Sequence, residues 1–536
     1  MTELLKNKLG EIFGDEIIRD LDFSSVKNKK DMISSIYEQI TDRKLRKEFG
    51  QFFTHKELVE FIVDNLPISA ETTILDPACG AGAFLIEALK RNTGNISNIY
   101  GIDIDPVAVE LSKLNIEVFS GKKIIENIVN ANTIKDFNFQ KNFPKIYTDG
   151  GFDIIIGNPP FQNLRKNVDY NEKESIYSEV INNVVNSATL MLAKGFEFLK
   201  EEGHLGFVLP KNLVRVDSFA MIRDFLIENT FIQQIFDVNH YFKDVRGDQI
   251  VLIFQKRKLS TVEMKGLKTK ISILDKNGDI NNPYSYYSPQ SDFRKYSFFP
   301  IFYREEIKQL TDKLLSIPET LEKVTKGQIF RGINLSVNHK AISKEKSEKS
   351  FITYRGDSIK KFGIKYPIYL NPLLLDKIVR KIGVLQKDKV ILQNIFSREG
   401  GITATCSNKN ELNIDTVTNV LSDDLDLKFI LGIMNSNLAN FFMIFIIFLV
   451  SNFTMHMDKK YIGRLPIIIP EEREIKEVIN LVDKLLELEE KNSQEYFSLF
   501  EQLNRKIYSI YKLDNSEIEL IEQLLRQVMS KRHFNG

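Results

Sequence analysis

Several features that mark common protein classes are scarce in this sequence. Its 536 residues contain two cysteines, Cys79 and Cys406, and no tryptophan. Two cysteines cannot build a disulfide framework, so we expect a protein of the reducing cytoplasm. The six histidines are scattered singly and show no spacing typical of a metal site. The sequence therefore predicts neither a disulfide-stabilised secreted domain nor a metal centre.

Long hydrophobic runs and an excess of one charge are also lacking. The longest apolar run, Phe441 to Val450, is too short to cross a bilayer, so we predict a buried helix there and no membrane partner. The first residues mix polar and apolar side chains, unlike a secretion signal. The 73 Lys and Arg residues balance 72 Asp and Glu residues, which gives a net charge of +1. Binding to nucleic acid would therefore need locally concentrated positive charge.

What the sequence does contain is organised around residues 152–161, Phe-Asp-Ile-Ile-Ile-Gly-Asn-Pro-Pro-Phe. The apolar run predicts a buried strand, and the prolines end it because they have no N–H for a sheet ladder. Asn158 and Phe161 are thus expected on a rigid loop at the carboxyl end of a strand, where open α/β sheets bind ligands. The Asn158 side chain and the Pro159 carbonyl offer two acceptors beside a flat ring. This combination suits a planar group with an exocyclic amine, although a turn that merely ends a strand would have the same pattern.

Acidic and small residues follow the earlier predicted strands. Asp76 follows an apolar stretch, and the small residues 78–83 behind it let the backbone approach a ligand closely. Asp103 ends the next strand and is our candidate for binding ribose hydroxyls, while Asp105 is predicted to cap a helix. Asn132 ends a third strand, where contact with an adenine edge and a simple turn role are equally compatible with the sequence.

Two further segments complete the predicted α/β domain. Thr54 and Glu57 have the spacing of a capping box for a helix to about residue 66, and the same helix start could hold a ligand carboxylate. The strands expected at 231–238 and 249–254 are joined by a loop too short for a helical crossover, so we predict that they are antiparallel. That loop contains Phe242, either a second ring for a planar substrate or a loop anchor. The fold class is α/β, with a doubly wound, mostly parallel sheet and one reversed edge strand.

The order of these motifs resembles that of the gamma class of S-adenosylmethionine (SAM)-dependent N6-adenine DNA methyltransferases. The resemblance covers about residues 50–255 and rests on Gln51-Phe52-Phe53-Thr54, then Asp76-Pro77-Ala78-Cys79-Gly80-Ala81-Gly82, then Asn158-Pro159-Pro160-Phe161. It implies a Rossmann-like SAM-binding fold and a target adenine that is flipped out of the duplex. Asn158 and Pro159 would hold that adenine, and Phe161 and Phe242 would stack on it.

The resemblance also implies cofactor contacts. Thr54 would lie against the methionine end of SAM, Asp76 and the small-residue loop would surround its methionine moiety, and Asp103 would hold the ribose. Relatives carry Asp where this chain has Asn132, which would contact the cofactor adenine through its side-chain oxygen. Methyl transfer would be direct, so Cys79 is interpreted as a packed structural residue. The complete set of cofactor candidates is Thr54, Asp76, Ala78, Gly80, Gly82, Asp103, Ile104, Asn132 and Asn158.

The second half of the chain resembles a TaqI-like target-recognition domain. The resemblance rests on Leu431-Gly432-Ile433-Met434-Asn435-Ser436-Asn437-Leu438, on Lys460 and on Ile462-Gly463-Arg464-Leu465-Pro466. We take Arg331, Arg355, Lys361 and Arg398 as candidates for DNA contacts. The predicted domains are a helical extension (1–48), a methyltransferase domain (49–258), an irregular linker (259–309), an α+β target-recognition domain (310–470) and a helical segment (471–536).

These inferences predict a sequence-specific adenine-N6 methyltransferase that uses SAM, binds double-stranded DNA and works beside a cognate restriction endonuclease. A methylation subunit that needs a separate specificity subunit is a close alternative. N4-cytosine methylation is another, although Asn rather than Ser at position 158 favours adenine. Methylation of RNA or of a protein glutamine would leave the large second half unexplained. The alternative outside enzymes is a catalytically silent DNA-binding module.

Overall fold

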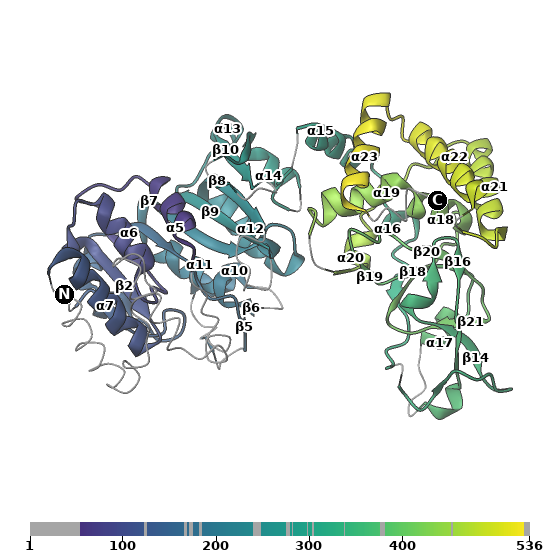
Figure 1. Cartoon of the computed structure of the whole chain (residues 1–536), viewed down its shortest axis with the longest axis horizontal. Helices are drawn as coiled ribbons and strands as arrows, with labels where there is room; N and C mark the ends of the chain where they lie inside the picture. Colours follow the sequence, from purple (N-terminus) through teal and green to yellow (C-terminus); the bar gives the residue numbers. More distant parts are fainter. Residues whose placement is uncertain are drawn as a thin grey trace, which may run out of the picture. The chain divides into compact units, whose positions relative to one another are not determined.

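The computed structural model forms two compact units, residues 1–301 and 302–536, which are described separately (Figure 1). The residues that the structure describes are 54–122, 126–165, 169–170, 175–181, 185–239, 248–274, 279–280, 282–296, 298–302, 305–336, 338–375, 381–451, 454–491 and 493–529. The predicted helical extension (1–48), residues 51–53 and Phe242 lie outside these ranges.

The first unit is built on a nine-stranded sheet in the order β11-β10-β8-β9-β7-β4-β1-β2-β3. Its strands are β1 (Ile74–Asp76), β2 (Ile99–Asp103), β3 (Ile128–Asn130), β4 (Phe152–Gly157), β7 (Leu199–Pro210), β8 (Thr230–Asn239), β9 (Gln249–Lys256), β10 (Lys268–Ile273) and β11 (Tyr284–Pro289). A separate antiparallel pair is formed by β5 (Asn163–Leu164) and β6 (Val185–Asn186). Within the large sheet, β9 and β11 run against the other strands. The sheet is therefore mostly parallel, as the sequence predicts.

Helices cover both faces of this sheet. They are α5 (Lys56–Asp64), α6 (Ala83–Arg91), α7 (Pro106–Ser120), α8 (Phe139–Asn142), α9 (Pro144–Thr148), α10 (Ser175–Val180), α11 (Ser187–Phe198), α12 (Ala220–Asn229), α13 (Thr261–Gly266) and α14 (Ser291–Lys295). Neighbouring residues of β7 face opposite helices: a Cβ atom on Gly206 would lie 2.9 Å from Ile62 of α5, whereas Leu205 lies against Gly195 of α11. The sheet is thus doubly wound.

Two details of the predicted sheet are corrected. Strands β8 and β9 are antiparallel as expected, but β9 lies inside the sheet, between β7 and β8, and the reversed strand at the edge is β11. The linker was predicted over residues 259–309, but residues 259–301 of this stretch belong to the first unit and contain β10 and β11. The polar composition of this stretch was misleading because some of its polar side chains, such as Thr269 and Gln290, are buried and have partners. Thr269 donates to the Ile232 carbonyl at 2.7 Å, and Gln290 accepts from the Ile232 N–H at 2.8 Å.

The second unit contains two four-stranded sheets and a group of helices. The sheets have the orders β12-β22-β18-β20 and β13-β17-β14-β21. The strands are β12 (Ile329–Arg331), β13 (Ile342–Ser343), β14 (Phe351–Tyr354), β15 (Ile359–Lys360), β16 (Gly363–Ile364), β17 (Ile368–Leu370), β18 (Lys389–Gln393), β19 (Ile395–Phe396), β20 (Ala404–Ser407), β21 (Glu411–Asn413), β22 (Val417–Val420) and β23 (Met455–His456). The helices are α15 (Glu305–Leu315), α16 (Leu321–Val324), α17 (Lys381–Leu385), α18 (Leu427–Asn435), α19 (Asn437–Phe441), α20 (Lys459–Ile462), α21 (Glu472–Glu487), α22 (Gln494–Ile510) and α23 (Asn515–Val528).

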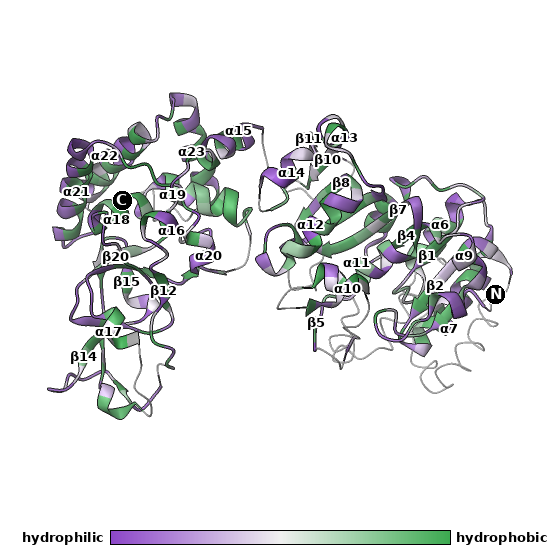
Figure 2. Cartoon of the chain, turned by 180° about the vertical axis from the view of Figure 1, so that it is seen from behind, coloured by the Kyte–Doolittle hydropathy of each residue, from purple (hydrophilic) through white to green (hydrophobic). Residues whose placement is uncertain are grey.

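The apolar run of the second unit lies in its core. A π-helix, η6 (Phe442–Ile447), continues α19, and all residues from Phe441 to Val450 are buried. Among the described residues, no single helix has the length and hydropathy to cross a membrane. Helix α18 and the following helical segment, Asn437–Ile447, reach that length and hydropathy only when taken together, and they are bent by 58° relative to each other. Figure 2 shows hydrophobic residues along the central strands and mixed polarity on helices α21 and α22, which have an apolar side and an exposed charged side.

Candidate functional site

Four neighbouring strands of the first unit end at the same edge of the sheet. The register pairs Asp76 of β1 with Gly101 of β2, and Asp103 of β2 with Asn130 of β3. On the other side, β1 pairs in parallel with β4, the strand that Asn158 follows. The structure therefore brings the predicted residues Asp76, Asp103 and Asn158 to one carboxyl edge, the usual ligand site of such sheets.

Asp76 is a buried carboxyl group at the centre of this edge. Its side chain is 1% exposed, and its Oδ1 atom accepts a hydrogen bond from the Ala78 N–H at 3.0 Å. Burial, with a smaller contribution from the nearby Asp103, raises the pKa of Asp76 to about 8. A Cβ atom on Gly157 would lie 2.7 Å from Asp76 Oδ1. Only glycine fits between the Asp76 carboxyl and the Asn158 loop. This role of Gly157 was not predicted from the sequence, although Gly157 directly precedes Asn158.

The loop of small residues is tied to the second strand. The Gly80 N–H donates to Asp103 Oδ2 at 2.7 Å, and the Cys79 N–H donates to the Ile102 carbonyl at 2.9 Å. Gly80 has a positive φ of 51°, and a Cβ atom added there would meet open space. Gly82 has a φ of 87° at the start of α6, where a Cβ atom would lie 2.7 Å from Ser112 Oγ. The loop is thus held in a conformation that leaves room beside its backbone.

Asp103 borders this open space. It accepts from the N–H groups of Gly80 and Asp105 at 2.7 and 2.9 Å, and burial raises its pKa to about 6. The next side chain, Ile104, is apolar and 52% exposed. Two carboxyl groups, an open backbone loop and an exposed apolar side chain fit a ligand that combines a cationic amino-acid end with a ribose and a flat base. The residues present therefore suit SAM.

Asn132 and Asp105 serve local structure. Asn132 Oδ1 accepts from the Ile134 N–H at 3.1 Å, which is the turn role that the sequence left open. Thr133 donates from its hydroxyl to the Pro77 carbonyl at 2.7 Å and so joins this turn to the small-residue loop. Asp105 accepts from the Val107 N–H at 2.9 Å and caps α7, as predicted. The Asn132 oxygen is used in the turn, and a contact between Asn132 and a cofactor adenine stays a prediction.

Asn158 is held by a residue far away in the sequence. Its Nδ2 atom donates to Thr54 Oγ1 at 2.9 Å, and its Oδ1 atom has no hydrogen-bond donor in the described part of the chain. The Ser187 hydroxyl donates to the Pro160 carbonyl and accepts from the Gln162 N–H at 2.8 Å, which anchors the loop. Phe161 is partly buried against the core beside it. The loop therefore presents the Asn158 oxygen on a rigid support.

The contact with Asn158 also corrects the role of Thr54 in helix capping. Helix α5 begins at Lys56, close to the predicted start, but its N-cap residue is His55 and makes no side-chain cap hydrogen bond. Thr54 lies one residue too early to cap the helix. The predicted capping box is therefore wrong.

Gln249 is a buried polar residue that was not among the predicted site residues. It is 1% exposed, and neither atom of its side-chain amide has a hydrogen-bond partner among the described residues. As the first residue of β9, it pairs with Pro210 at the end of β7 and with Asn239 at the end of β8. Gln249 thus lies at the ligand-binding edge of the sheet. The sequence has no local signal for this, since glutamine is usually exposed.

The two cysteines lie in different units and both are free thiols. Burial raises the pKa of the Cys406 thiol to about 12 and that of Cys79 well above its usual value. A buried thiol with a raised pKa is a poor nucleophile, which agrees with structural packing. The described residues contain no group of three or more His, Cys, Asp or Glu side chains that could hold a metal ion.

Each of the four predicted DNA contacts in the second unit makes a contact within that unit. Arg331 donates two hydrogen bonds to Asp458, at 2.6 and 2.9 Å. The other three pairings are Arg355 with Asp357, Arg398 with Glu399 at 2.9 Å, and Lys361 with the Phe500 ring, 4.6 Å from its centroid. Their role in binding DNA stays a prediction, and Arg331 would have to give up a bidentate ion pair to fulfil it.

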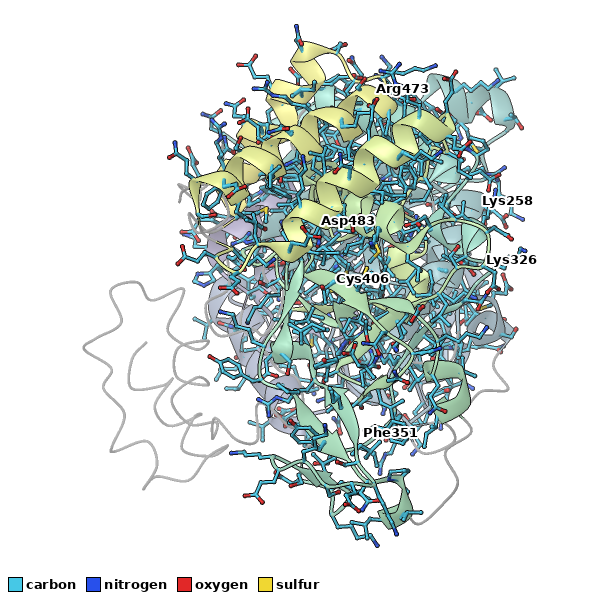
Figure 3. The ribbon with its side chains drawn as sticks, turned by 90° about the vertical axis from the view of Figure 1, so that its right-hand side faces the viewer. Lys258, Lys326, Phe351, Cys406, Arg473 and Asp483 are labelled. Atoms are coloured by element: carbon cyan, nitrogen blue, oxygen red, sulfur yellow. The ribbon has the colours of Figure 1, made fainter. Side chains whose placement is uncertain are left out.

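The motif at 431–438 is part of the core of the second unit. The buried Asn435 side chain accepts from the Ala404 N–H at 3.2 Å and donates to the Ala404 carbonyl at 3.0 Å, which joins α18 to β20. A Cβ atom on Gly432 would lie 2.8 Å from Val478 of α21, so this glycine permits the close packing of the two helices. An ion pair of 2.5 Å between Lys428 and Asp483 joins the same helices; Figure 3 shows Asp483 on α21.

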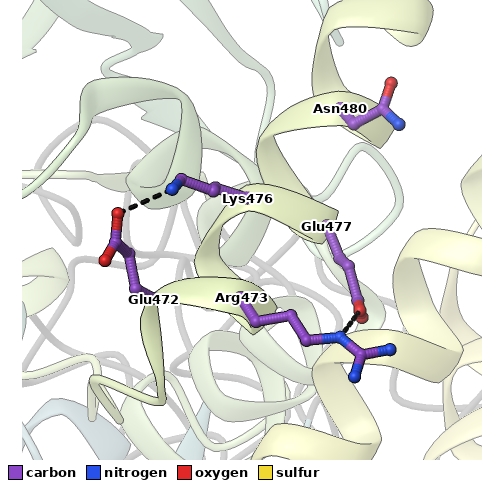
Figure 4. Close-up of a pocket in the computed structure, with 5 residues that line it drawn as sticks. All are labelled: Glu472, Arg473, Lys476, Glu477 and Asn480. Atoms are coloured by element: carbon purple, nitrogen blue, oxygen red, sulfur yellow. Dashed lines mark hydrogen bonds and ion pairs between the residues drawn. The ribbon is translucent and has the colours of Figure 1, made fainter.

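A surface depression on α21 has no feature of a binding site. It is lined by Glu472, Arg473, Lys476, Glu477 and Asn480. The charged side chains pair with one another along the helix, Lys476 with Glu472 at 2.7 Å and Arg473 with Glu477 at 3.0 Å (Figure 4). Such exposed pairs four residues apart are ordinary helix surface.

The sequence is similar to known proteins in both halves. Residues 28–297, half of the chain, match the family model N-6 DNA Methylase, and residues 352–467 match the TaqI-like C-terminal specificity domain. The chain is 28% identical over 227 residues to the type II methyltransferase M.VspI of Vibrio sp. (strain 343), a match that covers 42% of this chain and 52% of that protein. It is 25% identical over 352 residues to the type II restriction enzyme and methyltransferase RM.Eco57I of Escherichia coli, covering 53% of this chain and 34% of that protein.

The fold is also similar to a solved structure. The type IIL restriction-modification enzyme MmeI, determined in complex with DNA, aligns with a TM-score of 0.63 over 95% of this chain and 82% of the MmeI chain, at 13% identity. At this identity the likeness concerns the fold. The chain spans about half or less of the length of the two relatives above. Because the family model matches half of its residues, this chain belongs to the N-6 DNA methylase family.

Proposed function

We propose that this protein transfers a methyl group from SAM to the N6 amine of an adenine that is flipped out of double-stranded DNA. The observation that carries the proposal is the Asn158 side chain: its nitrogen is bound to Thr54, and its oxygen is left to accept a hydrogen bond at the ligand edge of the sheet. Family membership and the TaqI-like match at residues 352–467 support methylation at a specific DNA sequence.

The catalytic step follows from the chemistry of the amine. The N6 lone pair is delocalised into the adenine ring, so the amine is a weak nucleophile. The Asn158 oxygen and the Pro159 carbonyl would each accept a hydrogen bond from one N–H of the target amine. These bonds would favour a more tetrahedral nitrogen and stabilise the positive charge that develops on it. Because the loop is anchored by Ser187, these acceptors are positioned before the substrate arrives. Transfer would be direct: the bond from N6 to the methyl group forms as the bond from the methyl group to the cofactor sulfur breaks, the thioether product leaves, and the methylated amine gives up one proton to solvent.

The chain's own residues also explain how the cofactor would be held. SAM supplies an electrophilic methyl group on a sulfonium ion. Asp76 would pair with the ligand's ammonium group, and Asp103 would accept hydrogen bonds from the ribose hydroxyls. Ile104 would give an apolar surface for the cofactor's adenine, and the open backbone at Gly80 would leave room for the methionine moiety.

The second unit would select the DNA sequence. Flipping the target base costs on the order of a few kcal/mol, which stacking on Phe161 would partly offset. The relatives of this chain include type II restriction enzymes and methyltransferases. We therefore place the protein in a restriction-modification system, beside a cognate endonuclease that cuts unmethylated DNA.

The proposal is tested by sequencing DNA from cells that express the protein, with Asn158→Ala as the matched control. N6-methyladenine at one sequence motif, absent with Asn158→Ala, is the expected result. Modified cytosine at N4 would show that the pocket selects the other base. If neither base is modified, the test is repeated with candidate specificity subunits, because type I methylase subunits such as MjaIX of Methanocaldococcus jannaschii are 26% identical over 258 residues. No modification in any combination would refute the activity.

A further inference from the structure

The hydrogen bond between Thr54 and Asn158 suggests a second role at the proposed site. We propose that Thr54 is a positioning residue that determines which end of the Asn158 amide faces the target base. This inference rests on the proposed function, because it concerns how Asn158 accepts a hydrogen bond from the target amine.

The backbone around Asn158 leaves few other degrees of freedom. Asn158 precedes a proline, which restricts its own backbone, and the rings of Pro159 and Pro160 fix the following φ angles. The Ser187 hydroxyl holds the Pro160 carbonyl, and the Ser187 N–H donates to the Gln162 carbonyl at 2.8 Å. What remains is rotation of the Asn158 side chain, and Thr54 is its hydrogen-bond partner, at 2.9 Å.

The direction of the amide decides whether the site can work. With Nδ2 on Thr54, the Asn158 oxygen faces the ligand and can accept an N–H of the target amine. A rotation of 180° would present an NH2 group to another NH2 group, two sets of donors without an acceptor. The rotated state would therefore lose the interaction that stabilises the developing charge.

A threonine hydroxyl can accept or donate, so its own hydrogen must be committed elsewhere to make the direction unique. In the described part of the chain, Thr54 makes one hydrogen bond, the one it accepts from Asn158. Its hydrogen is thus available to the carboxylate of a bound amino-acid ligand. Once that hydrogen is donated, the Thr54 oxygen can only accept, and the Asn158 amide must point its nitrogen toward Thr54. Cofactor binding would in this way prepare Asn158 for the base.

Two variants separate this role from a simple cofactor contact. Thr54→Val keeps the shape of the side chain but neither accepts nor donates, and Thr54→Ser keeps the hydroxyl. At saturating SAM and DNA, we expect Thr54→Val to lower the single-turnover methylation rate by about three- to ten-fold or more, and Thr54→Ser to restore it. SAM affinity, measured by calorimetry without DNA, shows any loss of cofactor binding separately.

A binding measurement tests the amide direction without catalysis. Duplexes carrying adenine or purine at the target position differ by the N6 amine. For each variant, the affinities for the two duplexes are measured with S-adenosylhomocysteine, the product of SAM, bound, and their ratio is taken. The cost of breaking each base pair is the same for every variant, so it cancels when these ratios are compared between variants. We expect Thr54→Val to shift this ratio in the same direction as Asn158→Ala, and Thr54→Ser to keep the wild-type ratio.

The outcomes distinguish the two proposals. If wild-type protein makes N6-methyladenine but Thr54→Val keeps both its saturated rate and its affinity ratio, the positioning role is wrong, and weaker SAM binding alone would mark Thr54 as a cofactor contact. If wild-type protein makes no N6-methyladenine, the proposed function fails first and the positioning role with it. Thermal melting of each variant checks that the fold is intact.

Discussion

The two units use the same polar residue types in opposite ways. In the first unit, the Asn158 oxygen and both amide atoms of Gln249 have no partner in the described part of the chain. In the second unit, the buried side chains of Asn413 and Asn419 bond each other at 2.7 and 2.9 Å, and Asn435 bonds both backbone groups of Ala404. Unused hydrogen-bonding capacity at the ligand edge of the sheet, on the half-buried Asn158 and the buried Gln249, indicates a ligand site, whereas a saturated buried amide indicates a scaffold.

The largest effect is expected at Asn158. Asn158→Ala removes the acceptor that stabilises the developing charge, and we expect the methylation rate to fall by about 10²- to 10³-fold. Thermal stability should change little, because in the described part of the chain the side chain makes one hydrogen bond. Single-turnover kinetics and melting curves measure the two effects. A variant that unfolds, or that keeps its rate, would contradict the assignment.

The raised pKa of Asp76 makes ligand binding depend on pH. Because burial raises this pKa to about 8, the free protein carries a proton on Asp76 at pH 6 to 7, and a cationic ligand must displace it. SAM affinity should therefore rise by up to about tenfold per pH unit toward pH 8 and then level off. The same shift makes the free fold less stable as pH rises from about 4 to 8, since the folded state holds this proton more tightly than the unfolded state does.

Calorimetry in buffers with different ionisation heats should detect the proton released on SAM binding. Asp76→Asn has no proton to lose, so the dependence above pH 6 should disappear with it. Asp103, with a pKa raised by burial to about 6, would add a similar dependence at lower pH. Unchanged proton release in Asp76→Asn would show that another group is titrating.

In the second unit, a buried asparagine should matter for stability. Asn435→Ala leaves the Ala404 N–H without this acceptor in the core, and we expect a loss of about 1–3 kcal/mol in the free energy of unfolding. The exposed Asn480 of α21 is the matched control, and Asn480→Ala should change stability by less than about 0.5 kcal/mol. Denaturant unfolding measures both. If Asn435→Ala lowers the methylation rate but leaves stability unchanged, Asn435 has a role in methylation and not in stabilising the fold.

The smallest effect sharpens the contrast within the first unit. In the part of the chain that the structure describes, the buried Gln249 amide has no partner. Gln249→Met replaces it by an apolar side chain of similar size, so we expect stability to rise by about 1 kcal/mol. Gln290 is equally buried but accepts from the Ile232 N–H and donates to the Thr230 carbonyl at 2.7 Å. Gln290→Met should therefore destabilise the protein. Equal changes in both variants would show that hydrogen bonding does not distinguish these two residues.

Part of this protein was determined by local sequence. Apolar runs ended by Asp, Asn and Pro indicated the strands and their ligand-binding edge, since parallel strands place their carboxyl ends together. The antiparallel pair β8 and β9 also followed from the short connection between them. Chemistry that depends on residue type and on strand ends, such as the acceptors at Asn158 and Pro159, could therefore be named before the structure.

Contacts between distant segments were decided only by the tertiary structure. The Thr54–Asn158 hydrogen bond, the fit of Gly157 against Asp76 and the burial of Gln249 all depend on which strands and helices become neighbours. The ion pair between Arg331 and Asp458 also depends on which segments become neighbours. Residues 259–301 read as a linker because polarity alone cannot distinguish a solvated side chain from a buried one with a partner. Periodicity reports which face of an element is apolar, but the partner of each polar group is set by the order of the sheet.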